Sequence, residues 1–105
     1  MLAISTQKVA QIILMRHELS RAEGELRGVI EALNEDEAAE LVAVMWIGRG
    51  AFEAEEIAEA IATARAEATT PTADYLLGTP HLADHLEAGL EALGIDVSAA
   101  EDDAM

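Results

Sequence analysis

The spacing of apolar residues along this chain of 105 residues is that of helices. Between Leu26 and Leu33, apolar side chains fall at positions i, i+3, i+4 and i+7, which share one face of a helix. A similar stripe, from Val9 to Ile13, follows Ser5 and Thr6, either of which can cap a helix N-terminus. Alternating apolar and polar positions, as strands need, are scarce. The pattern predicts an all-α fold.

A segment from about 35 to 47 is expected to form the central helix. Asn34 and Glu37 have the spacing of a capping box, in which each side chain accepts a hydrogen bond from the other residue's backbone N–H. From Leu41 to Ile47 every residue is apolar, and a helix that is apolar on all sides is one that other helices surround.

Gly48 and Gly50 are expected to end that helix, because glycine adopts the left-handed conformation of a helix C-terminus at little cost. Arg49 then lies at the negative end of the helix dipole, which is favourable by about 0.3–1 kcal/mol. Its guanidinium is also suited to a carboxylate elsewhere in the fold, so we expect a clamp to the C-terminal helices. A pocket for a small anion is the alternative.

Further helices are expected at about 53–67, 72–77 and 80–93. Thr-Pro pairs at 70–71 and 79–80 predict two helix starts, with threonine as cap and proline at the first helical position. Gly94 is the expected end of the last helix. Together these segments predict one compact domain, residues 1–94, made of five to six short helices. Residues 95–105 are expected to form an acidic flexible tail.

The charge of the chain restricts its partners. Six Lys and Arg against 21 Asp and Glu give a net charge of −15, which argues against binding to nucleic acid or to an anionic membrane. The acidity keeps a small protein soluble, or it attracts a partner with a basic surface. There is no cysteine, and the first apolar run is too short for a signal peptide. We therefore expect a cytoplasmic protein.

Candidate chemistry is sparse. No serine lies in a nucleophile elbow and no glycine-rich phosphate loop is present, so we expect no catalytic residues and no cofactor. His81 and His85 are four residues apart, with Asp84 between them, a spacing that puts both imidazoles on one helical face. They are candidate metal ligands only if another helix supplies a third, such as Glu40 or His17; otherwise they are a surface pair.

Two stretches carry a resemblance to a known family. The segments from Ala39 to Gly50 and from Ala73 to Gly94, read with the helices around them, resemble the domain of unknown function DUF3775. The resemblance implies a small all-helical domain and transfers no activity. The residues that would form the family's signature are Glu40, Trp46, Gly48, Arg49, Gly50, Tyr75, Leu76, Gly78, Pro80, Leu86, Gly89 and Leu90.

We therefore expect a non-catalytic protein-interaction or self-association module, either a homodimer or bound to another protein. Its candidate site residues are Glu40, Trp46, Arg49, Tyr75 and Asp84. Trp46 is interpreted as a core residue, with an anchor at an interface as the alternative. The competing hypothesis is a protein that binds a small ligand, an anion or a metal, through Arg49, Tyr75, His81 and His85.

Overall fold

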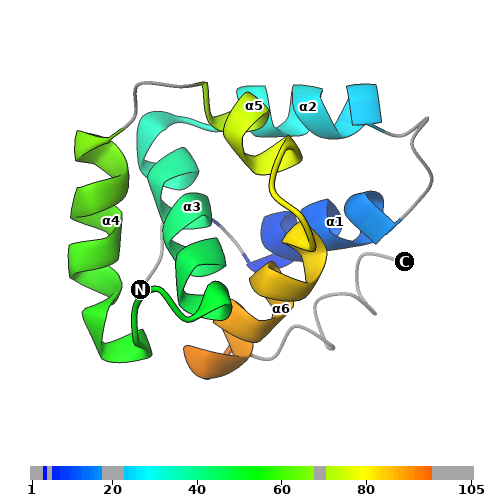
Figure 1. Ribbon diagram of the computed structural model, residues 1–105. Coiled ribbons are helices and arrows are strands. Elements are labelled where there is room, and N and C mark those ends of the chain that lie inside the picture. Colours follow the sequence, from blue (N-terminus) through cyan, green and yellow to red (C-terminus); the bar gives the residue numbers. More distant parts are fainter. Residues whose placement is uncertain (1–3, 5, 18–22, 68–70, 96–105) are drawn as a thin grey trace.

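The structure, a computed structural model, describes residues 4, 6–17, 23–67 and 71–95, and within them the chain is all-α, as predicted (Figure 1). The described residues contain no strand. The helices are α1 (Thr6–His17), α2 (Glu23–Glu31), α3 (Glu35–Arg49), α4 (Ile57–Ala66), α5 (Thr72–Leu77) and α6 (Leu82–Ala92), with a 3-10 turn, η2 (Ala54–Glu56), before α4.

Helix α3 is the centre of the fold, as its apolar sequence predicts. It packs most extensively against α6 and next against α4, which lie on opposite sides of it in Figure 1. Every residue from Ala39 to Ile47 is buried. The remaining helices surround this core, with α1 against α6 and α2 against α5.

Two glycines bring the backbones of α3 and α6 together. A Cβ atom on Gly48 would lie 1.7 Å from the carbonyl oxygen of His85, and one on Gly89 would lie 2.1 Å from that of Val44. The prediction that Gly48 ends the helix is therefore wrong, since α3 continues to Arg49. Gly48 is a contact residue because no side chain fits between these backbones.

Both ends of α3 confirm the local signals in the sequence. The Asn34 side chain accepts a hydrogen bond from the Glu37 backbone N–H at 2.8 Å, and the Glu37 side chain accepts one from the Asn34 N–H at 3.1 Å. At the other end Gly50 has a φ of 89°, and its N–H bonds to the last carbonyl groups of the helix. The capping box separates α2 from α3.

In the second half of the chain, α5 spans Thr72–Leu77 as predicted, but α4 and α6 begin later than predicted, at Ile57 and Leu82. Thr79 does not cap the last helix; it is buried, and its hydroxyl donates a hydrogen bond to the Tyr75 carbonyl at 2.9 Å. A buried hydroxyl needs a partner, and α5 provides the nearest one. Helix α6 starts at Leu82, after His81 in a left-handed conformation with φ 57°. The predicted cap at Thr70 lies outside the described residues.

The expected apolar stripes form the core. The buried members from the outer helices are Val9, Ile12, Ile13, Leu26, Ile30, Leu76, Leu82, Leu86 and Leu90. Gly94, with φ 78°, follows α6 as predicted, and the expected tail beyond Ile95 lies outside the described residues. Among the helices described, none has the length and apolar character that crossing a bilayer requires.

Gly89→Ala should destabilise the protein by about 3 kcal/mol, because the new methyl group meets the Val44 backbone and forces α3 and α6 apart. Gly28→Ala is the matched control, since a Cβ there meets nothing within 4 Å and α2 is helical at that position. The control should gain about 0.5–1 kcal/mol. Urea unfolding measures both changes, and equal effects at the two sites would contradict the close contact.

Candidate functional site

The structure brings together two of the predicted site residues, Trp46 of α3 and Tyr75 of α5. The indole N–H of Trp46 donates a hydrogen bond to the Tyr75 hydroxyl at 2.8 Å. Phe52 stacks on Trp46, with 5.7 Å between the ring centroids and an angle of 26° between the planes. The tryptophan is 8% exposed, so its N–H depends on this partner.

Trp46 and Tyr75 border a pocket of about 550 Å³ between α3, α4 and α5. Four small or aliphatic residues, two aromatic residues and four polar ones line it. The lining consists of Glu35, Ala38, Ala39, Val42, Trp46, Ala64, Arg65, Glu67, Thr72 and Tyr75. A pocket of this volume, lined by both apolar and polar residues, is large enough to hold a ligand or a side chain of a partner.

Among the charged residues of the described lining, the one cation is paired and the two carboxylates are not. Arg65 forms an ion pair with Asp36, which joins α4 to α3. Glu35 and Glu67 are exposed and have no ion pair with any residue that the structure describes. With Arg65 neutralised by Asp36, the pocket presents a net negative charge.

The Tyr75 hydroxyl gives the pocket a donor. It accepts the hydrogen bond from Trp46 and keeps its own proton, for which the described residues provide no acceptor. The hydroxyl is also fixed in position, because its partner is held in the core. A fixed donor beside an apolar wall orients a bound group and provides no nucleophile.

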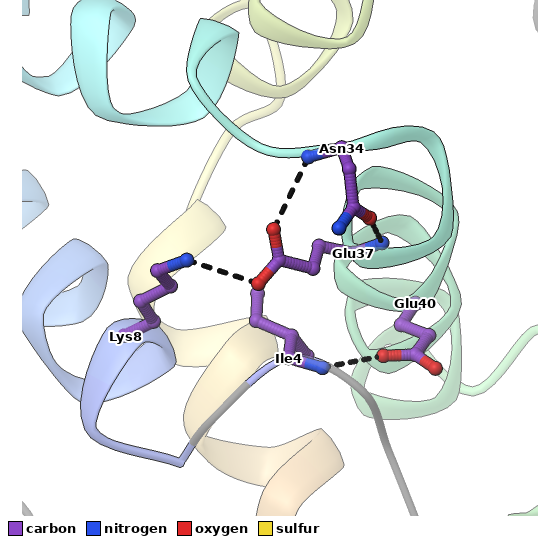
Figure 2. Close-up of polar contacts among 5 residues, drawn as sticks. All are labelled: Ile4, Lys8, Asn34, Glu37 and Glu40. Atoms are coloured by element: carbon purple, nitrogen blue, oxygen red, sulfur yellow. Dashed lines mark hydrogen bonds and ion pairs between the residues drawn. The ribbon is translucent and has the colours of Figure 1, made fainter.

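Glu40 does not line this pocket; it contacts Ile4, two residues before α1. Figure 2 shows Glu37 pointing from α3 toward Lys8 of α1, and Glu40 pointing toward Ile4. Glu40 is 8% exposed and accepts a hydrogen bond from the backbone N–H of Ile4 at 2.8 Å. One turn earlier, Glu37 forms an ion pair with Lys8 of α1 at 2.9 Å. The two glutamates therefore attach α1 to the central helix.

The pKa of Glu37 lies below its ordinary value of 4.5. The hydrogen bond from the Lys8 ammonium is the main cause, and the N–H of Asn34 adds to it. Both donors stabilise the ionised carboxylate.

Arg49 is exposed at the last residue of α3, where its charge opposes the negative end of the helix as predicted. It has no ion pair with any described residue, so the part of the chain that the structure describes does not form the expected clamp. Arg49 also does not line the pocket. The predicted cluster with Glu40, Tyr75 and Asp84 is not assembled around it.

The histidines give no metal centre within the described residues. His81 precedes α6 instead of lying in it, and its Nδ1 atom is 3.9 Å from a carboxylate oxygen of the exposed Asp84. Nowhere in the described ranges do three His, Asp or Glu side chains lie close enough to hold a metal ion. The side chain of His17, one proposed third ligand, lies outside the described residues.

The sequence contained a signal for this pocket that our interpretation missed. Glu35, Ala38, Val42 and Trp46 lie at helical spacing along one side of α3. Ala64 on the facing helix is small, so it leaves space opposite the stripe. The signal available in the sequence was therefore this stripe together with an alanine-rich helix facing it.

Residues 23–95 match the family model described as "Protein of unknown function (DUF3775)". The matched range begins at α2 and includes every residue that lines the pocket. Searches of curated proteins and of solved structures found no match.

Tyr75→Phe should lower the free energy of unfolding by about 1–2 kcal/mol, because the Trp46 N–H loses its acceptor. The same change in a Trp46→Phe background should cost much less, since the donor is then absent. Chemical unfolding followed by circular dichroism measures this double-mutant cycle. If the losses of unfolding free energy from the two substitutions are additive, the hydrogen bond does not contribute to stability.

Glu37→Gln should alter the pH dependence of stability. Because the pKa of Glu37 is lower in the folded protein, ionisation stabilises the fold above pH 4.5, and this contribution is lost as the pH falls through the folded pKa. The variant keeps an acceptor for Asn34 but loses the charge that Lys8 binds. The gap in unfolding free energy between wild type and variant should therefore close on acidification. Glu91→Gln, which alters an exposed carboxylate outside this cap, is the matched control. The same closing gap in both variants would contradict a role for the contacts of Glu37.

Proposed function

The chain belongs to the DUF3775 family, and we propose that this member is a non-catalytic protein-interaction module. The observation that supports the proposal is the pocket between α3, α4 and α5, where Trp46 and Tyr75 are fixed against each other. Tryptophan and tyrosine are the residues most enriched at the centres of protein interfaces. Since the fold already holds both rings, a partner does not have to order them.

The chemistry of the lining favours binding over catalysis. The described lining residues include no histidine, cysteine or serine, and no base lies against a nucleophile. Apolar walls and one oriented hydroxyl are sufficient to select a side chain of a partner. We therefore assign recognition of a partner, and no reaction, to this site.

The small-ligand hypothesis now depends on Tyr75, since Arg49, His81 and His85 do not line the pocket. We favour a protein segment over a free small molecule because the pocket opens to solvent and the exposed carboxylates of Glu35 and Glu67 are part of its lining. A bound metabolite in the purified protein would reverse this preference.

A different protein is a better partner than a second copy. The outer face of α4 has exposed Ala58 and Ala62 beside half-buried Ile57 and Ile61, which favours some self-association. Each copy, however, carries a net charge of −15, and two such surfaces repel each other. The homodimer and the cytoplasmic location both stay predictions from the sequence.

A photo-crosslinking residue in place of Thr72, which lines the pocket, tests the proposal in the native cells. Illumination should yield one covalent product with another protein, and the purified partner should bind the unmodified chain in solution. The matched control carries the same residue at the exposed Ala92 of α6, outside the lining. Identical products from both positions, or a product of twice the mass of this chain, would contradict the proposal.

A further inference from the structure

We propose that the pocket recognises a short segment of the partner that carries basic residues near an apolar one. This inference rests on the proposed function and specifies the chemistry of the partner. The basic side chain pairs with Glu35 and Glu67, and the apolar side chain packs at the end formed by Trp46 and Tyr75.

The charge of the pocket lining favours an occupant that carries positive charge. Glu35 and Glu67 have no ion pair among the described residues, whereas Arg65, the one cation of the described lining, is bound by Asp36. An occupant that brings positive charge therefore gains two attractions, while an anionic occupant meets two repulsions. The net charge of −15 acts in the same direction at longer range.

The order of residues along α3 separates the acidic part of the pocket from its aromatic part. Glu35 and Trp46 are eleven positions apart in one helix, which is about 16 Å along its axis. The acidic and the aromatic parts of the pocket are thus separated, with Ala38, Ala39 and Val42 between them. An extended segment covers this distance with about five residues.

The small apolar residues of the lining also suit a basic side chain. Lysine and arginine carry long aliphatic stems that pack on small apolar residues while the charged group stays near water and carboxylates. The alanines beside Glu35 offer such a surface. Phosphate-bearing partners are disfavoured by the same charges.

The test uses three capped hexapeptides, RRGSGL, EEGSGL and RRGSGS, titrated up to millimolar concentration into the purified protein. Trp46 is the one tryptophan of the chain, so its fluorescence reports occupation of the aromatic end. RRGSGL should change this fluorescence in a saturable way and bind more weakly as salt is raised. EEGSGL should not bind, and RRGSGS should leave the Trp46 signal nearly unchanged.

Two double variants separate a local from a general charge effect. Glu35→Gln with Glu67→Gln should weaken binding of RRGSGL about tenfold, from the loss of two surface pairs. Glu31→Gln with Glu91→Gln changes the net charge equally but alters exposed residues outside the lining, and should weaken binding less than about twofold. Circular dichroism confirms that both variants keep their helices.

Equal weakening by the two double variants would overturn the inference, because bulk charge would then explain the binding. Equal binding of RRGSGL and EEGSGL would also overturn it, yet would leave the pocket as the docking site of the proposed function. No binding of RRGSGL would reject the basic segment. The crosslinking from Thr72 fails or succeeds independently of these titrations, so the two proposals are tested separately.

Discussion

The backbone contact between α3 and α6 is the constraint on which the rest of the structure depends. Gly48 and Gly89 face the opposite helix at a distance that admits no side chain, since each would-be Cβ atom overlaps a carbonyl oxygen. The aromatic content of the chain is low, so aliphatic and small residues must fill the core. Close approach of two helices increases their contact without large side chains.

Away from the α3–α6 contact, α3, α4 and α5 leave a pocket bordered by Trp46. Ion pairs between helices, Arg65 with Asp36 and Arg27 with Asp74, use basic residues to join the elements around this opening. Glu35 and Glu67 have no ion pair among the described residues. The excess of acidic residues in the sequence therefore also gives the pocket a negative charge.

The sequence predicted what depends on local interactions. The cap at Asn34 was identifiable because both of its partners lie within one turn. The role of Gly48 was not, since a glycine that ends a helix and one that admits a neighbouring backbone look alike in sequence. Thr79 was misassigned because its burial, which turns the hydroxyl back to α5, depends on the tertiary fold. The bond between Trp46 and Tyr75 joins residues 29 positions apart, a pairing that no local pattern predicts.

Two features define this structure: α3 lies against α6 through its glycines, and the Trp46 indole is held by Tyr75 in the free protein. A nuclear Overhauser spectrum of the isotope-labelled protein tests both features in one measurement. We expect cross-peaks between the Gly48 Hα protons and the Gly89 amide proton, and between the Trp46 indole N–H and the ring protons of Tyr75. Absence of both, with Trp46 showing contacts to other residues instead, would contradict this structure.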